Sequence, residues 1–314
     1  MTSVTRTSTS TRTPRDTRLR ALDPLLPAVH ALPEPAEGDI TFTLPGAEAR
    51  YRRRRLDPAA YEASWSALDR HQLHARLTGP DPARALDGLL AAWDKRMAAG
   101  GHPAGDAEAV FTWPSRDTEV TPVLLAHGFT PKTVTAVRTT GAHPADTGPP
   151  GAGDPLVRPL VPRDPAELDR AVALWLDELR WDEQFGGTVR REASGRHARQ
   201  RLADPAAWVW VAERDGRITG LLHAEPPANA AWAARLTSGR RAGYLATLMV
   251  EAADRGAGTG TALVRTAHLA LAEAGATHTL LHYAALNPLS GPFWHRAGYR
   301  PLWTTWVRRP APHR

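Results

Sequence analysis

The stretch that decides the fold is Tyr244-Leu-Ala-Thr-Leu-Met-Val250, followed by Glu251-Ala-Ala-Asp254 and Arg255-Gly-Ala-Gly-Thr-Gly260. The first segment is apolar and typical of a strand, and a helical pattern begins at Thr261 after the glycines. Glycine lets a backbone approach a ligand closely because no Cβ blocks the way. The amides at a helix N-terminus are unpaired and carry partial positive charge, so this strand, turn and helix predict a pyrophosphate site.

Three phosphate-binding motifs compete for this loop. A P-loop requires a lysine after its last glycine, and none follows Gly260. A dinucleotide-binding fingerprint, G-x-G-x-x-G/A, would end at Thr261 or Leu263, and the following strand has no carboxylate for the ribose. The third pattern, R-x-x-G-x-G after a strand, fits Arg255 to Gly260 at every position. The remaining alternative is a tight glycine-rich turn without a ligand.

The flanking segments predict an ordered series of elements. Asp164-Pro-Ala-Glu167 is typical of a helix start, with an acidic N-cap, proline at the first position and glutamate at the third. Asp215-Gly216 lies between two apolar runs and predicts a hairpin. Strands are expected at 156–161, 208–213, 218–224, 244–250, 277–283 and 299–308, with helices from 165, over 261–274 and over 290–297, and a helix or loop over 188–202.

A second motif follows the predicted fifth strand. It runs from Asn287 through Trp294 to Gly298-Tyr299. With the R-x-x-G-x-G loop and the order of elements, it resembles the GNAT superfamily of acetyltransferases, from Val157 to about Arg308. The family usually has a tyrosine, proposed to protonate the departing thiolate, where Trp294 stands. Because indole is not a proton-transfer acid near neutral pH, we expect Trp294 to pack in the core.

The resemblance implies an α/β protein with a GNAT fold, a mixed and mostly antiparallel sheet flanked by helices. It also implies acetyl-CoA as the acyl-donor substrate, held by the loop and by the backbone of the strand before it. Arg255 contributes through its side chain or as a packing residue. The implied cofactor-binding residues are Leu248, Met249, Val250, Arg255, Gly256, Ala257, Gly258, Thr259, Gly260, Thr261 and Asn287.

The expected reaction is N-acetyl transfer to an amine. The chain has no cysteine, so a cysteinyl acyl-enzyme is excluded and direct transfer in a ternary complex is expected. Candidate catalytic residues are His282, whose ordinary pKa lies near neutrality, Tyr244 on the neighbouring strand, and Ser290 as a hydroxyl donor. Each has a structural alternative, respectively a hydrogen-bonded histidine, strand packing and a helix cap. The scattered histidines predict no catalytic metal.

The remainder of the chain contains a faint repeat. Gly128 and Gly298 are 170 residues apart, an aromatic residue follows each, and a polar residue, Asp117 or Asn287, precedes each by eleven positions. Helices are expected at 59–77 and 83–99, a strand at 110–113, a helix at 117–127 and a strand at 132–138. We interpret this part as a degenerate GNAT-like half that no longer binds coenzyme A, or else as an unrelated α/β accessory domain.

Charge and composition bound the organisation and the partners. The expected division is a disordered basic tail at 1–38, an accessory domain at 39–138, a Pro/Gly linker at 139–155 and a catalytic domain at 156–310. The net charge of +6 and the Arg52–Arg55 run suggest nucleic acid, but no nucleic-acid motif accompanies them. We therefore expect a cytoplasmic monomer or homodimer that acts on a small-molecule or peptide amine, without membrane or nucleic-acid partners. The alternative function is a non-catalytic acyl-CoA-binding regulatory module.

Overall fold

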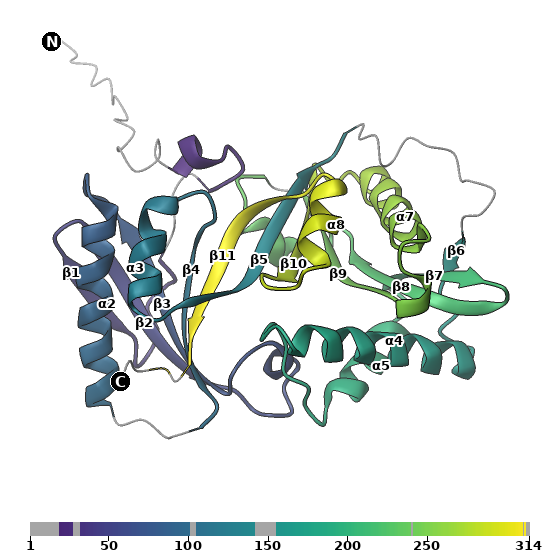
Figure 1. The fold of residues 1–314 in the computed structure, drawn as a ribbon, viewed down its shortest axis with the longest axis horizontal. Helices are drawn as coiled ribbons and strands as arrows, with labels where there is room; N and C mark the ends of the chain where they lie inside the picture. Colours follow the sequence, from purple (N-terminus) through teal and green to yellow (C-terminus); the bar gives the residue numbers. More distant parts are fainter. Residues whose placement is uncertain are drawn as a thin grey trace, which may run out of the picture.

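The computed structural model describes residues 19–27, 32–100, 105–141, 155–239, 241–309 and 311. Within them one sheet of eleven strands runs through the molecule in the order β1-β2-β3-β4-β11-β5-β10-β9-β8-β7-β6 (Figure 1). Two pairs, β3/β4 and β9/β10, are parallel and the others are antiparallel. The predicted mixed, mostly antiparallel α/β fold is therefore confirmed. The strands are β1 (Ile40–Leu44), β2 (Ala47–Arg55), β3 (Asp69–Leu77), β4 (Ala107–Pro114), β5 (Thr130–Thr139), β6 (Leu156–Pro159), β7 (Trp208–Arg214), β8 (Arg217–Glu225), β9 (Ala242–Val250), β10 (His278–Ala284) and β11 (Arg300–Arg308).

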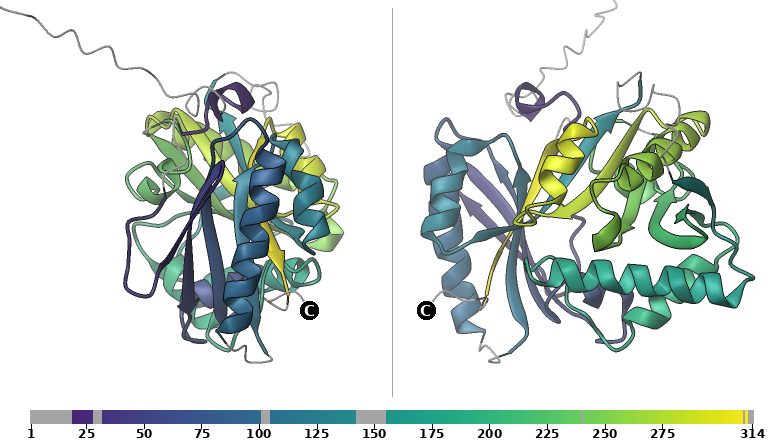
Figure 2. Two further views of the ribbon diagram at one scale, coloured as in Figure 1. Left: turned by 90° about the vertical axis from the view of Figure 1, so that its left-hand side faces the viewer. Right: turned by 45° about the vertical axis from the view of Figure 1, so that its right-hand side comes forward.

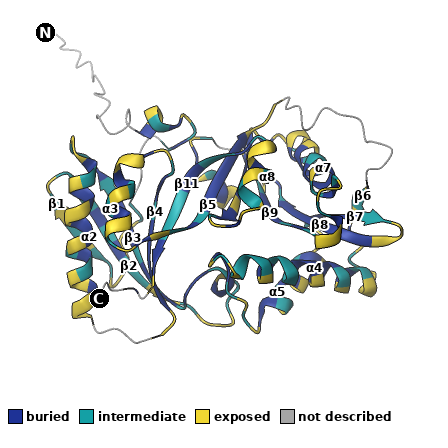
Figure 3. Ribbon diagram, viewed as in Figure 1, coloured by how far each residue is buried: buried dark blue, intermediate teal, exposed yellow. Residues whose placement is uncertain are grey.

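Helices cover the sheet in separate groups, each over its own core. In Figure 2, α2 and α3 lie together against the N-terminal half of the sheet, and in Figure 1 α4 and α7 lie apart over the C-terminal half. Burial follows the same plan, because the sheet-facing stripes of α2 and α4 are buried and their outer stripes exposed (Figure 3). The helices are η1 (Tyr61–Trp65), α2 (Pro82–Ala99), η2 (Thr118–Val120), α3 (Thr121–Ala126), α4 (Pro165–Glu183), α5 (Ser194–Ala203), α6 (Ala231–Ala234), η4 (Ala252–Asp254), α7 (Thr259–Glu273) and α8 (Ser290–Arg296). No helix in the described ranges is long and apolar enough to cross a membrane.

Most predicted elements of the C-terminal half are present. Asp164 caps α4 by accepting hydrogen bonds from the amides of Ala166 and Glu167. The β7–β8 hairpin turns at Asp215-Gly216, both with positive φ, as a two-residue turn of this type requires. α7 begins two residues before the predicted start, at Thr259.

The repeat is visible in the backbone of both halves. The amides of Gly128 and Phe129 close α3 on the carbonyls of Leu125 and Leu124, 2.9 Å in each case. The amides of Gly298 and Tyr299 close α8 in the same way, on the carbonyls of His295 and Trp294 at 3.0 Å. Both glycines have positive φ, which a side chain would disfavour. The N-terminal half therefore has a strand–helix–strand–helix–strand unit like that of the C-terminal half.

The two halves exchange their last strands. β11, from the C-terminal half, lies between β4 and β5, and β5, from the N-terminal half, lies between β10 and β11 (Figure 1). Each half therefore has the same strand order. The strand next to β4 belongs to the C-terminal half, and the strand next to β10 belongs to the N-terminal half. The division into domains at 39–138 and 156–310 stays a prediction, but any such boundary separates strands that pair in one sheet.

Two sequence expectations need correction. Residues 59–77 were expected to be helical and instead form η1 and the strand β3. In β3 buried residues alternate with partly exposed ones, but the buried positions include Asp69 and His71, so the apolar alternation that marks a strand is hidden. His71 bonds Tyr51 and Asp69 pairs with Arg53, and these contacts make the burial of polar side chains possible.

Residues 19–27, which the sequence assigns to a disordered tail, pack against the sheet. Leu19 and Leu26 are buried in a cluster with β5, β10 and β11, and Asp23 forms a two-pronged ion pair with Arg300 of β11 at 2.8 and 2.9 Å. These contacts stabilise residues 19–27 against the sheet. Residues 1–18 and 28–31 lie outside the described residues, as does most of the predicted linker, from 142 to 154.

Candidate active site

No side chain caps the N-terminus of α7. Its N-cap is Gly258, at φ 85°, and the first turn has neither a capping side chain nor an acidic residue. Gly256 also has positive φ, whereas Gly260 packs against the Phe293 ring, 3.3 Å from where a Cβ would stand. Thr259 is 1% exposed, and its hydroxyl has no hydrogen-bond partner among the residues that the structure describes. Free amides, a positive helix end and an unpartnered buried hydroxyl form a site for an anion.

The strand before the loop offers further unpaired backbone. The parallel pairing of β9 with β10 stops at Leu245–Leu281, so residues 246–250 have no partner on that side. On the other side the pairing with β8 passes from Thr247 directly to Leu245, which makes Ala246 the extra residue of a bulge. A bulge and a strand separation together leave backbone amides and carbonyls available to an extended ligand.

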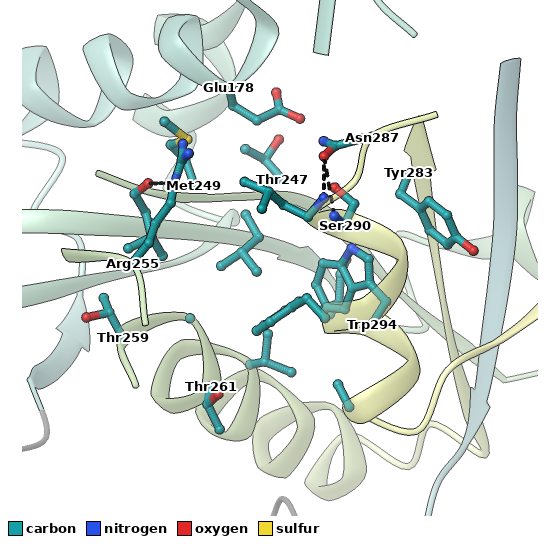
Figure 4. A pocket seen from close by; sticks show the side chains of 18 of the residues that line it. Glu178, Thr247, Met249, Arg255, Thr259, Thr261, Tyr283, Asn287, Ser290 and Trp294 are labelled. Carbon is teal, nitrogen blue, oxygen red and sulfur yellow. Dashed lines mark hydrogen bonds between the residues drawn. The ribbon is translucent and has the colours of Figure 1, made fainter. Parts of the chain in front are cut away.

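These elements enclose a cavity of about 570 Å³ between β9, β10, α4, α7 and α8 (Figure 4). Of the predicted site residues, Tyr244 and Ala257 do not line it. The predicted residues that do line it are Leu248, Met249, Val250, Arg255, Gly256, Gly258, Thr259, Gly260, Thr261, His282, Asn287 and Ser290.

One end of the cavity is basic. Arg255 donates from Nε to the Val250 carbonyl at 3.1 Å, and its guanidinium lies 4.9 Å from the Trp181 ring centroid. Arg265 of α7 and Arg296 of α8 also line the cavity. Guanidinium groups suit phosphate geometry, so this end complements a multiply charged anion.

Two carboxylates also line the cavity. Glu178 and Asp182 lie one turn apart on α4 and both line the cavity, with Glu178 across the cavity from Thr261 (Figure 4). Burial, and then the charge of Asp182, raise the pKa of Glu178 well above its usual value. Burial also raises the pKa of Asp182, although Asn287 donates a hydrogen bond to it at 2.8 Å. Within the described residues the Glu178 carboxylate makes no hydrogen bond or ion pair.

Tyr244 and His282 meet on the face of the sheet toward α6. The Tyr244 hydroxyl lies 2.9 Å from Nδ1 of His282, and the Trp232 ring stacks on the imidazole at 6.2 Å. The side chain of His282 is exposed and lines the cavity, and desolvation by the protein around it lowers the pKa of its imidazole to about 4. Burial raises the pKa of Tyr244. At neutral pH both groups are therefore uncharged.

Asn287 and Ser290 have structural partners as well as a place in the cavity. The Asn287 side-chain oxygen accepts from the amides of Leu289 and Ser290 and so caps α8 (Figure 4). Trp294 is 7% exposed and packs edge-on against Phe293 and Tyr299, as expected for a core residue.

Trp181 and Asp182 fall in the segment 181–201 in which the sequence places the acceptor pocket, whereas Glu178, Arg265 and Arg296 were missed. Glu178 and Asp182 stand at i and i+4 on α4, a helix whose start the sequence predicts. That spacing was the available signal for a shared direction. The arginines of α7 and α8 carry no comparable signal, because exposed arginines are common on helices.

The C-terminal half matches a known family. The model of the "Acetyltransferase (GNAT) domain" matches residues 205–301, from just before β7 into β11. No curated protein matches the chain in sequence. Among solved structures, a GCN5-related N-acetyltransferase from Sphaerobacter thermophilus is 17% identical with a TM-score of 0.51, over 85% of this chain and 78% of that one. One from Kribbella flavida is 15% identical with a TM-score of 0.45, over 87% of this chain and 90% of that one.

The fold is thus of the GNAT type, and residues 205–301 match the acetyltransferase (GNAT) domain model in sequence as well. The similarity to the S. thermophilus structure covers more of the chain than the family match, so the N-terminal half shares in a GNAT-like fold. The match to this family model supports an acyltransferase that takes its acyl group from an acyl-CoA.

Proposed function

We propose that the C-terminal half transfers an acetyl group from acetyl-CoA directly to an amine, carried by a small molecule or a peptide. The observation that supports this most is the uncapped, glycine-lined N-terminus of α7 at the mouth of a cavity that continues along unpaired β9 backbone. A pyrophosphate fits the helix end, and a thioester with its linking arm fits the strand.

The basic end of the cavity would hold the phosphates. Amides from Gly256 to Thr261 and the Thr259 hydroxyl are the donors, and Arg255, Arg265 and Arg296 provide charge. Backbone groups of Leu248 to Val250 would orient the linking arm. The bulge at Ala246 would place an amide toward the thioester oxygen and stabilise the charge that develops there.

The chemistry needs two proton movements. An ammonium loses one proton, its nitrogen attacks the thioester carbon, the C–N bond forms and the C–S bond breaks. After the attack, the nitrogen releases a second proton and becomes an amide nitrogen. The departing thiolate takes up one proton. Tyr244 and His282 would orient the incoming amine as neutral hydrogen-bonding groups, and Ser290 would donate toward sulfur.

The competing function is acyl-CoA binding without catalysis. The core packing of Trp294 favours it, because the residue at the usual tyrosine position has no acidic hydroxyl. Both functions predict acetyl-CoA binding, so turnover with amines separates them.

The first test places a carboxylate at the anion site. Thr261 is exposed in the first turn of α7, where an aspartate stabilises a helix but repels a pyrophosphate. We expect Thr261→Asp to keep the fold and to weaken acetyl-CoA binding on the order of 100-fold, because like charges a few ångströms apart repel by a few kcal/mol. Titration calorimetry measures the loss.

The matched control is Thr121→Asp, which adds the same charge to the first turn of α3 in the N-terminal half. It should bind acetyl-CoA as the unmodified protein does. Unchanged binding in Thr261→Asp, or no binding by the unmodified protein, would refute the proposed site. Binding without acetylation of any amine would favour the regulatory alternative.

A further inference from the structure

The two edges of the sheet differ, because β6 at one end is protected and β1 at the other is open. β6 contains Pro159 and Arg158, and Arg158 pairs with Glu167 and Glu213. Prolines and charges are the usual protection of an edge strand. β1 reads Ile40-Thr-Phe-Thr-Leu44, with no charge, proline or bulge, and lies at the outer margin of the molecule (Figure 1). An uncharged, regular edge of this kind is a template for another strand.

The backbone groups at the open edge belong to Thr41 and Thr43. Pro45-Gly46 is a two-residue turn, so Leu44 and Ala47 on either side of it form a hydrogen-bonded pair. Because hydrogen-bonded pairs alternate along an antiparallel ladder, the amides and carbonyls of Thr41 and Thr43 point away from β2. Both residues are exposed, and within the described residues no hydrogen bond reaches these backbone groups.

The open edge is self-complementary about Phe42. Its sequence reads nearly the same in both directions, with a threonine on each side of Phe42 and then Ile40 and Leu44. When a second copy pairs antiparallel with Phe42 opposite its own equivalent, Thr41 lies opposite Thr43 of the second copy. Each such threonine pair exchanges two hydrogen bonds, so every outward amide and carbonyl is satisfied. Threonine pairs and aromatic pairs are also favourable side-chain neighbours across strands.

The charges next to the edge match in the same register. On the exposed face Thr41 lies beside Arg50 of β2, and Thr43 lies beside Glu48. Each row of the joined sheet would therefore run from Arg50 through two threonines to Glu48 of the second copy. Opposite charges stand at the two ends of every row, and no like charges face each other across the edge.

There is room for the helices of both copies. Ile40, Phe42 and Leu44 face α2 and are only partly buried against its core. α2 packs mainly on β2, one strand in from the edge. With strands about 4.8 Å apart, the two α2 helices would lie roughly 14 Å apart, more than the helix diameter of about 10 to 12 Å. The apolar side chains of the two β1 strands would fill the groove between the helices.

We propose that the chain forms a homodimer through β1, with the two strands antiparallel about a twofold axis at Phe42 and the two sheets joined into one. An edge of five residues is short for an interface, and stable interfaces bury about 1,000 Å² or more. The dimer therefore assembles and dissociates with protein concentration. The cavity lies between elements of the other half, so the dimer is independent of acyl transfer.

Sedimentation velocity from low micromolar to near-millimolar protein measures the association. We expect the mass of the sedimenting species to rise from one chain to two over this range. Thr43→Pro removes an outward amide and leaves the ladder with β2 intact, since that amide does not face β2. It should weaken the dimer, because two of the hydrogen bonds between the strands are lost.

Two double variants that differ only at position 41 test the register. Thr41→Lys/Thr43→Lys places lysine opposite lysine twice, whereas Thr41→Glu/Thr43→Lys places glutamate opposite lysine twice. We expect the first to weaken the dimer roughly tenfold or more relative to the second, since two like-charged cross-strand pairs replace two opposite ones. The second variant should dimerise less well in high salt, which screens its ion pairs. Thermal unfolding at low protein concentration checks that both variants fold.

The outcomes decide between the dimer and its alternatives. A chain that stays monomeric at near-millimolar concentration refutes the dimer. A dimer with the same dissociation constant in both double variants and in Thr43→Pro refutes pairing through β1. Equal loss of the dimer in the two double variants refutes the register in which Thr41 lies opposite Thr43.

Discussion

Two helices of this protein begin after equivalent strands, but the backbone amides of their first turns differ in whether a side chain caps them. α2 follows β3 through a connection of four residues, and Asp81 caps it by accepting from the amide of Arg84 at 2.9 Å. Pro82, at the first helical position, has no amide hydrogen to offer. α7 follows β9 through eight residues, with Gly258 as its N-cap and no side chain that satisfies its amides. The chain's own Asp81 caps the start of α2, whereas the amides at the start of α7 require a ligand.

The comparison shows where function resides in a repeated fold. Both halves have a parallel strand pair that separates, a helix between its strands, and a second helix closed by glycine. The binding site depends on the length and composition of one turn. Asp81 places a negative charge where the C-terminal half would bind one, which supports the proposal that the N-terminal half does not bind coenzyme A.

The largest expected effect concerns the exchange of strands. A chain of residues 155–314 alone would lack β5, which pairs with β10 on one side and β11 on the other. We expect this fragment to be insoluble or to unfold without cooperativity, because both neighbours would expose unpaired edges. Circular dichroism and thermal unfolding measure this.

The control keeps every strand and breaks only the connection. Residues 1–148 and 149–314, produced together as two chains, should assemble and bind acetyl-CoA, since the break falls between β5 and β6. A fragment 155–314 that unfolds cooperatively and binds acetyl-CoA would show that the halves are independent after all.

A smaller effect concerns a buried ion cluster around β4, where the two halves meet. Glu108 of β4 is fully buried and accepts from Lys132 of β5 at 3.1 Å and from Arg309, after β11, at 2.6 Å. His278 of β10, 170 residues later, is also buried but bonds to Thr237 and Thr277 instead. The N-terminal half thus uses charges at a position where the C-terminal half uses hydrogen bonds to hydroxyl groups.

We expect Glu108→Ala to reduce the free energy of unfolding by about 3–5 kcal/mol, because it leaves the buried ammonium of Lys132 without a counter-charge. Urea unfolding monitored by tryptophan fluorescence measures the loss. The double variant Glu108→Leu/Lys132→Met removes both charges and should lose less. A loss below about 1 kcal/mol in Glu108→Ala would show that this cluster does not stabilise the junction.

How much the sequence predicts differs between elements for physical reasons. The α7 loop, the α4 cap and the Asp215-Gly216 turn follow from local chemistry and were predicted from it. β3 was missed because hydrogen-bonded Asp69 and His71 occupy buried positions. The strand exchange depends on pairing between distant segments, for which neither β5 nor β11 has a local signal.

The candidate site divides in the same way. Residues of the loop and of β9 belong to a contiguous motif and line the cavity as a group. Glu178 and Arg296 come from other elements, and the packing of α4 and α8 brings them to the cavity. Such residues are found only when the tertiary arrangement is known.

The smallest expected effect tests the two helix starts directly. Asp81→Ala removes the cap of α2 and should lower the free energy of unfolding by about 1 kcal/mol, the usual value of an N-cap side chain. Acetyl-CoA affinity and stoichiometry should not change, because the short turn and Pro82 still leave no room for a pyrophosphate. Calorimetry would contradict this comparison if a second acetyl-CoA bound to the variant. In that case a single carboxylate, rather than the shape of the turn, would be what keeps the N-terminal half from binding coenzyme A.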